Sequence, residues 1–136
     1  MKEQSCILIV DDDPDDCELL QETLEEVGIA FTINVAHDGP AAFEFLKTLN
    51  GNLPKLIILD VNMPMMNGVD FLSNLNSLYS IPVIMYTTTC DEHLVKEAKE
   101  LGAIDCVTKG TTYMDGLKFA RRVAELVGSC MPIDKS

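Results

Sequence analysis

The stretch that decides the fold is Cys6-Ile-Leu-Ile-Val-Asp-Asp-Asp-Pro14. Its five apolar residues predict a buried strand, and Asp13 followed by Pro14 predicts the N-cap and the first residue of a helix. Gly28 ends that helix, and the helix places a row of apolar residues on one face: Cys17, Leu20, Leu24 and Val27. A buried strand that leads straight into an amphipathic helix is the repeating unit of parallel α/β sheets.

The rest of the chain repeats this unit. Further strands are predicted at residues 31–35, 56–59, 82–86 and 106–108. Asp38 is predicted to cap a second helix that buries Ala42, Phe45 and Leu49, and weaker patterns predict helices at about 69–78 and 92–101. Thr112 and Asp115 form a capping-box pattern ahead of a fifth helix with Leu117, Ala120, Val123 and Val127 on its apolar face.

Five strands alternating with five helices predict an α/β fold with a parallel sheet and helices on both faces. Residues 31–35 alternate between apolar and polar side chains, as an edge strand does, whereas the other long strands are nearly all apolar. The whole chain, 1–136, is expected to form one domain, with its core at about 5–127 and a short tail at 128–136.

Composition narrows the classes of function. The formal net charge is -12, so a nucleic-acid partner would be repelled. The five cysteines form no C-x-x-C pair, which favours a reducing compartment, and no apolar run is long enough for a signal peptide or a membrane span. We therefore expect a cytoplasmic protein that binds neither nucleic acid nor membrane.

Polar residues follow the predicted strands where a parallel sheet opens its binding crevice. They are Asp11 and Asp12 after the first strand, Asp60 after the third, Thr87 to Thr89 after the fourth and Lys109 after the fifth. Neighbouring carboxylates repel one another unless a cation compensates, and Mg²⁺ prefers oxygen ligands. Asp12 and Asp60 with a backbone carbonyl are the predicted ligands, and Asp11 is predicted to act from behind them.

This pattern also predicts a reaction. An ionised Asp60 beside a cation and Lys109 can attack phosphorus and form an aspartyl phosphate, because metal and ammonium stabilise the phosphoryl oxygens. Thr87 can donate a hydrogen bond to the product. Asp13, Asp15 and Asp16 are assigned to the helix start, where the helix dipole favours negative charge.

Three stretches and one lysine make the chain resemble a response-regulator receiver domain of two-component signalling, of the stand-alone, chemotaxis-regulator-like type. They are Ile7-Leu-Ile-Val-Asp-Asp, Leu56-Ile-Ile-Leu-Asp60-Val-Asn-Met-Pro-Met-Met-Asn-Gly68, Pro82-Val-Ile-Met-Tyr-Thr87-Thr and Lys109. The resemblance covers about residues 5 to 127. It implies the flavodoxin-like strand order 2-1-3-4-5, Asp60 as phosphoacceptor, Asp11 and Asp12 as the acidic pair, and Asn62 giving its backbone carbonyl to Mg²⁺.

The same resemblance implies a phosphoprotein in a phosphorelay, which takes its phosphoryl group from a histidine kinase or a phosphotransfer protein and catalyses only its own phosphorylation and dephosphorylation. Thr87 and Lys109 match the family's switch hydroxyl and lysine. The output is expected at a protein-binding surface, with a homodimer through the fourth helix, fifth strand and fifth helix as one form. Asn62, Thr88 and Thr89 stand where they can tune the lifetime of the phosphate.

Two positions depart from the family pattern. Gly110 stands where the family usually has a proline, often after a cis peptide, and suggests a looser loop. Cys106 stands where many members carry an aromatic ring that swings inward when the threonine moves, so switching at this position is expected to differ.

Two other functions fit parts of the pattern. A phosphatase of the haloacid-dehalogenase type also forms an aspartyl phosphate, but it generally needs an acid two residues after the nucleophile, where this chain has Asn62. A phosphorylation-independent adaptor would use the same fold as a binding surface only. The intact set of Asp11, Asp12, Asp60, Thr87 and Lys109 argues against it.

Overall fold

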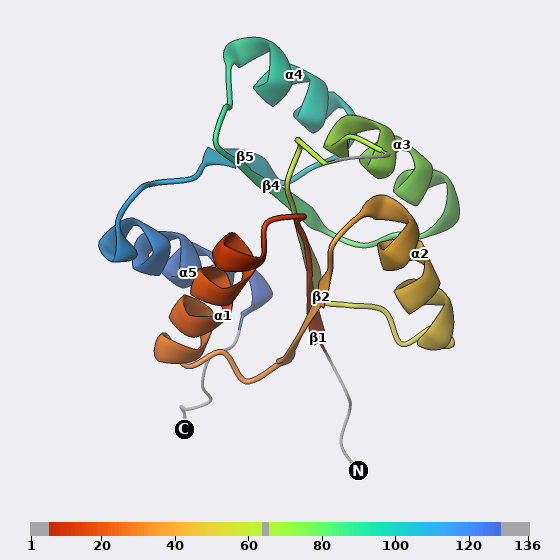
Figure 1. Ribbon diagram of the computed structural model, residues 1–136. Coiled ribbons are helices and arrows are strands. Elements are labelled where there is room, and N and C mark those ends of the chain that lie inside the picture. Colours follow the sequence, from red (N-terminus) through yellow and green to blue (C-terminus); the bar gives the residue numbers. More distant parts are fainter. Residues whose placement is uncertain (1–5, 64–65, 129–136) are drawn as a thin grey trace.

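The structure is a computed structural model that describes residues 6–63 and 66–128. Strands and helices alternate throughout this part of the chain, as predicted (Figure 1). The elements in chain order are β1 (Cys6–Val10), α1 (Pro14–Glu26), β2 (Thr32–Ala36), α2 (Gly39–Thr48), β3 (Leu56–Leu59), α3 (Gly68–Leu78), β4 (Val83–Thr87), α4 (Glu92–Glu100), β5 (Asp105–Thr108) and α5 (Tyr113–Val127).

All strand pairs in the sheet are parallel, and the strand order is β2-β1-β3-β4-β5. This confirms the predicted flavodoxin-like α/β fold, with β2 as an edge strand. The three central strands are the most apolar because neighbouring strands and helices enclose them on all sides. Every residue of β1 and of β3 is buried.

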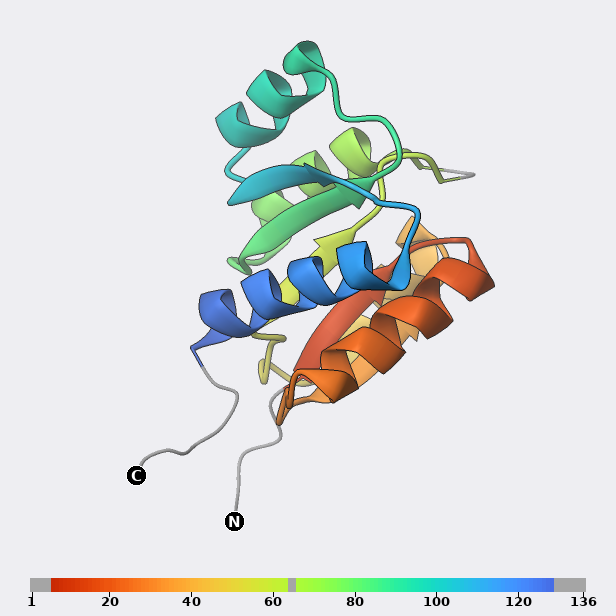
Figure 2. The same ribbon diagram turned by 90° about the vertical axis from the view of Figure 1, so that its left-hand side faces the viewer.

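The sheet separates two apolar cores. Figure 1 shows α1 and α5 on one face and α2, α3 and α4 on the other, and in both views α1 and α5 lie side by side (Figure 2). The first core contains buried residues of α1 and α5, among them Leu20, Leu24 and Phe119. The second contains Phe71 and Leu75 of α3 with residues of α2 and α4.

The predicted helix caps are confirmed. The Asp13 side chain accepts hydrogen bonds from the backbone N–H groups of Asp15 and Asp16, and Asp38 accepts one from Ala41 at 2.7 Å. Thr112 and Asp115 form the capping box at the start of α5. These contacts satisfy backbone donors that a helix start leaves without partners, which explains why the helix starts could be read from sequence.

Several predicted boundaries are wrong by one residue. β2 and β4 each begin and end one residue later than 31–35 and 82–86, and β5 begins one residue earlier, at Asp105. Thr87 is therefore the last residue of β4 and not the first residue after it. Pro82 lies outside β4, since it has no N–H for a strand ladder, but its carbonyl accepts the N–H of Ile57 at 2.9 Å.

The apolar face of α2 also differs from the prediction. Leu46 is buried together with Ala42, whereas Phe45 and Leu49 are only partly buried against the same core. The predicted tail lies outside the described residues except for Gly128, which ends α5 in a left-handed conformation. Within the described residues, no helix is long and apolar enough to cross a membrane.

Candidate functional site

The backbone of the site continues the hydrogen-bond ladder of the sheet. Beyond β1, the Asp11 N–H donates to the carbonyl of Ala36 at 3.0 Å; beyond β3, the Asp60 N–H donates to Val10 at 2.9 Å. Beyond β5, the Lys109 N–H donates to Thr87 at 2.7 Å. The carboxyl ends of parallel strands share one edge, so residues 49 to 98 positions apart in sequence from Asp11 meet there.

Asp11, Asp12 and Asp60 form an acidic cluster at this edge. Each offers one carboxylate oxygen, and these oxygens lie within 4.8 Å of one another. Asp11 and Asp60 are buried, and Asp12 is exposed. An all-oxygen set of carboxylates with an open side suits a hard divalent cation such as Mg²⁺. Asp11 already uses both oxygens, one for the N–H of Asp13 at 3.0 Å and one for Lys109.

The Lys109 ammonium lies among three carboxylates. Its Nζ is 2.7 Å from Asp11 Oδ2, 2.8 Å from Asp16 Oδ2 and 3.7 Å from Asp60 Oδ2. Burial lowers the pKa of Lys109, but the hydrogen bonds to Asp11 and Asp16 outweigh it, so the pKa rises above its ordinary value and the lysine stays charged. The ammonium thus brings positive charge to the acidic cluster.

The contact of Asp16 is the part of the site that the sequence did not predict. The helix-start interpretation describes its backbone, which the Asp13 side chain caps, but not its carboxylate. No spacing signal joins residues 16 and 109. The contact follows from the packing of α1 beside α5, which brings the first turn of α1 next to the loop after β5.

Several groups act on the pKa of Asp60. Burial raises it above the ordinary value, and the neighbouring charge of Asp11 raises it further, whereas Lys109 and the backbone N–H of Asn62 lower it. That N–H lies 3.3 Å from Asp60 Oδ1. The buried carboxylate is thus held in a setting where an added cation would favour its ionised form. The Asn62 carbonyl as a metal ligand stays a prediction.

Thr87 is fully buried at the end of β4, and its hydroxyl has no hydrogen-bond partner among the described residues. It faces Asp60 closely enough to lower the pKa of that carboxyl group, without reaching hydrogen-bond geometry. A buried hydroxyl without a partner is costly, so this position suits a group that arrives only when the site is loaded. Thr88 and Thr89 are exposed beside it, and their predicted effect on phosphate lifetime stays a prediction.

Cys106 is buried on the same side of the sheet as the α3 and α4 core, in register with Met85 of β4. Burial and the neighbouring Cys90 thiol raise the pKa of Cys106 to about 12. The thiol is therefore protonated and behaves as a small apolar side chain. Its predicted role in switching stays a prediction.

Gly110 leaves room for the start of α5. A Cβ at this position would collide with the side chain of Asp115, which folds back to accept the backbone N–H groups of Thr111 and Thr112 at 3.2 and 3.3 Å. Where the family usually has proline, this chain thus has a glycine against which the Asp115 carboxylate packs. Gly68 is required by a similar close approach at the start of α3, where a Cβ would lie 2.8 Å from the Asp60 carbonyl oxygen.

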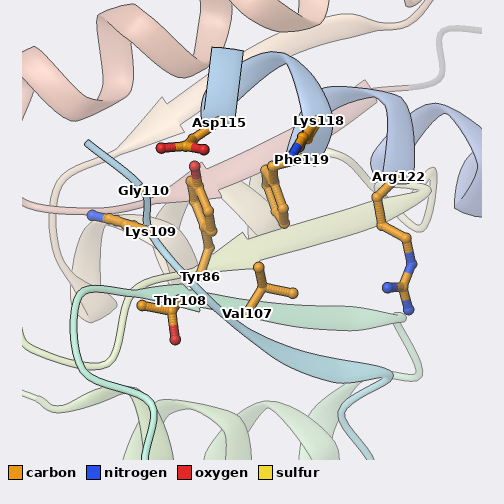
Figure 3. A pocket seen from close by; sticks show the side chains of 9 residues that line it. All are labelled: Tyr86, Val107, Thr108, Lys109, Gly110, Asp115, Lys118, Phe119 and Arg122. Carbon is orange, nitrogen blue, oxygen red and sulfur yellow. The ribbon is translucent and has the colours of Figure 1, made fainter. Parts of the chain in front are cut away.

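A pocket of about 430 Å³ lies beside the acidic cluster, between β4, β5 and α5 (Figure 3). Figure 3 shows the Tyr86 ring parallel to that of Phe119; their centroids are 3.7 Å apart. Lys109 Nζ is 5.9 Å from the centroid of the Tyr86 ring. Lys109 therefore contacts both the acidic cluster and the aromatic wall of the pocket.

Comparison with known proteins decides the family. Residues 7–121 match the family model described as the response regulator receiver domain. The chain belongs to this family. Membership connects the receiver domain to two-component signalling, and the acidic cluster described above occupies the place expected for its phosphorylation site.

Known proteins resemble this receiver domain over most of its length. The transcriptional regulatory protein CpxR of Escherichia coli (strain K12) is 42% identical over 103 residues, which are 76% of this chain and 42% of CpxR. The Mn²⁺-bound form of response regulator Rcp1 has 30% identity and a TM-score of 0.78, covering 89% of this chain and 92% of that one. The phosphorylated cyanobacterial phytochrome response regulator RcpA has 25% identity and a TM-score of 0.82, covering 96% and 98%.

The receiver domain spans less than half the length of the curated relatives that it matches first. The shares range from 27% of a protein-glutamate methylesterase/protein-glutamine glutaminase from Hydrogenovibrio crunogenus to 44% of the CpxR homolog of Haemophilus influenzae. The esterase name describes that longer protein, whereas receiver domains are generally signalling modules without catalysis of their own.

Proposed function

We propose that this chain is a phosphoacceptor of a two-component phosphorelay, with Asp60 as the residue that is phosphorylated. The observation that carries the proposal is the position of the Asp60 carboxylate. It is buried directly after β3, and one of its oxygens lies within 4.8 Å of a carboxylate oxygen of Asp11 and of Asp12. Lys109 Nζ is 3.7 Å from Asp60 Oδ2. The family match supports it, as does the phosphorylated state named for RcpA.

The donor set fits Mg²⁺. Asp12 and Asp60 would hold the ion, with the Asn62 carbonyl as a third protein ligand and Asp11 behind them, because both Asp11 oxygens already accept hydrogen bonds. When bound, the ion supplies positive charge that neutralises the phosphoryl oxygens. The Mn²⁺ named for Rcp1 supports a divalent ion at such a site.

The reaction follows from the residues. An Asp60 carboxylate oxygen attacks phosphorus and forms the new P–O bond, while the P–N bond to the donor histidine of a histidine kinase or phosphotransfer protein breaks and the imidazole leaves. Lys109 stabilises the equatorial oxygens through its charge. Thr87 donates its free hydroxyl hydrogen to a phosphoryl oxygen, which gives the buried group its missing partner.

We infer that the output is a change in a protein-binding surface. Lys109 contacts Tyr86, and Tyr86 stacks on Phe119 of α5, so a change at the phosphorylated residue reaches the pocket between β4, β5 and α5. That pocket adjoins the α4, β5 and α5 face on which a downstream partner or a second copy would bind. No enzymatic step beyond the chain's own phosphorylation and dephosphorylation is proposed.

Intact mass spectrometry after incubation with acetyl phosphate and Mg²⁺ tests the proposal. We expect one added phosphoryl group on the native protein and on Asp70→Asn, an exposed acid in the first turn of α3 that serves as the control. We expect none on Asp60→Asn or in EDTA. Failure of the native protein to gain mass and to bind beryllofluoride would favour the adaptor. Turnover of small phosphate esters would favour the phosphatase.

A further inference from the structure

The hydrogen bonds of the Lys109 ammonium are unevenly distributed among its three carboxylate neighbours. An ammonium has three N–H donors. Two are used, on Asp11 at 2.7 Å and on Asp16 at 2.8 Å, while Asp60 lies at 3.7 Å, outside hydrogen-bond range. The lysine is thus anchored on the α1 side of the site and leaves the nearest Asp60 oxygen without a hydrogen bond from it.

The start of α1 does not depend on the Asp16 side chain. The Asp13 side chain caps the helix through the backbone N–H groups of Asp15 and Asp16. Asp15 provides the same negative charge in the same helical turn, but it is exposed. Among the described residues the ion pairs of Lys109 are with Asp11, Asp16 and Asp60. The Asp16 carboxylate, 39% exposed, instead reaches across to a lysine 93 residues away in sequence.

We propose that Asp16 is a positioning residue that keeps Lys109 from closing onto Asp60. This rests on the proposed function, because it concerns the same Asp60 carboxylate. Without Asp16, Asp60 becomes the second acid available to the ammonium, and a shift of about 1 Å, from 3.7 to 2.7 Å, would give it a hydrogen-bonded ion pair like that with Asp11. Lys109 would then compete with the divalent cation for Asp60.

The third donor adds to this role. With two N–H groups held by Asp11 and Asp16, the remaining N–H is available for an oxygen that arrives beside Asp60. A group already held in place loses less freedom when it binds its target, which is the advantage of preorganisation. Asp16 therefore acts through Lys109 and touches neither the cation nor the phosphoryl group.

Mg²⁺ affinity, measured with Mg²⁺ alone by calorimetry or by NMR titration, tests the inference. Asp16→Ala is compared with Asp15→Ala, which removes the same charge from the same turn. We expect the Mg²⁺ dissociation constant to rise about tenfold in Asp16→Ala, the lower end of the range for partners behind metal ligands. We expect it to change little in Asp15→Ala and to recover in Asp16→Glu, which restores an acceptor for Lys109.

A second measurement separates positioning from general damage to the fold. The phosphorylation rate with acetyl phosphate is followed against Mg²⁺ concentration; for Asp16→Ala we expect half-saturation about tenfold higher, with recovery toward the native rate at saturating Mg²⁺. Equal Mg²⁺ affinities for Asp16→Ala and Asp15→Ala would overturn the inference and leave the proposed function intact. A native protein that neither binds Mg²⁺ nor gains a phosphoryl group would overturn both.

Discussion

Replacing Lys109 by Met tests how strongly the site depends on one positive charge. Methionine keeps a long apolar side chain but removes the ammonium, so Asp11 loses its counter-charge in a place where its side chain is 6% exposed. Removing one partner of a buried ion pair costs about 3–5 kcal/mol. The half-exposed Asp16 adds at most about 1 kcal/mol, because solvent screens its pair with Lys109. We therefore expect the free energy of unfolding to fall by about 3–5 kcal/mol.

The assay is urea unfolding at neutral pH in EDTA. In a thermal scan the same loss corresponds to a fall in Tm of about 10–17 °C for a chain of this size. Lys96→Met is the control, because Lys96 is an exposed residue of α4 and its replacement should change stability by less than about 0.5 kcal/mol.

Magnesium adds a second arm to the same experiment. Without the ammonium the acidic cluster is more negative, so we expect Mg²⁺ to stabilise Lys109→Met by more than it stabilises the native protein and to narrow the gap between them. If Lys109→Met lowers the free energy of unfolding by less than about 1 kcal/mol in EDTA, the reasoning is refuted, because a solvent-screened surface ion pair contributes no more than that. If Mg²⁺ leaves the difference in stability between Lys109→Met and the native protein unchanged, the link between the lysine and the cation site is refuted.

Three further predictions concern single groups. The pKa of Asp60 is raised above 3.8, so the folded state binds the proton of this carboxyl group more tightly than the unfolded state, and ionising Asp60 costs stability as the pH rises above that value. In urea unfolding in EDTA, the stability of Asp60→Asn relative to the native protein should therefore increase between about pH 4 and pH 7. Thr112→Ala removes the N-cap of α5 and should cost about 1 kcal/mol in the same assay, whereas Thr111→Ala should cost almost nothing. Among the described cysteines, half-buried Cys90 should react with iodoacetamide before buried Cys6, Cys17 and Cys106, as peptide mapping would show. Labelling of Cys106 ahead of Cys90 would contradict the packing.

Much of the fold could be predicted because it depends on local signals. The Asp13 and Pro14 pair, the Asp38 cap and the capping box of Thr112 and Asp115 each satisfy backbone donors within one helical turn, so each is visible in a few residues of sequence. The boundaries of β2 and β4 were wrong by one residue, because register with β1 and β3 sets them. Such pairing is a property of the sheet and not of the strand.

The candidate site also contains residues that local sequence signals predict and one that they do not. Asp11, Asp60 and Lys109 could be predicted to meet because each lies immediately beyond a strand, and parallel strands share their carboxyl edge. Asp16 lies in the first turn of α1, and its position in the sequence does not distinguish it from Asp15 in the same turn. Its contact with Lys109 depends on how α1 and α5 pack, for which the sequence has no local pattern.

The charges of the site also limit the order in which its ligands can arrive. The Lys109 ammonium lies among the carboxylates of Asp11, Asp16 and Asp60, and Asp12 joins the same acidic cluster. Four carboxylates against this one ammonium leave three negative charges in excess. A phosphoryl group on Asp60 would add further negative charge, so its entry before a divalent cation would meet repulsion in a partly buried site. We therefore expect Mg²⁺ to bind before phosphorylation. The buried Thr87 hydroxyl, which has no partner among the described residues, is then the donor left for the group that arrives last.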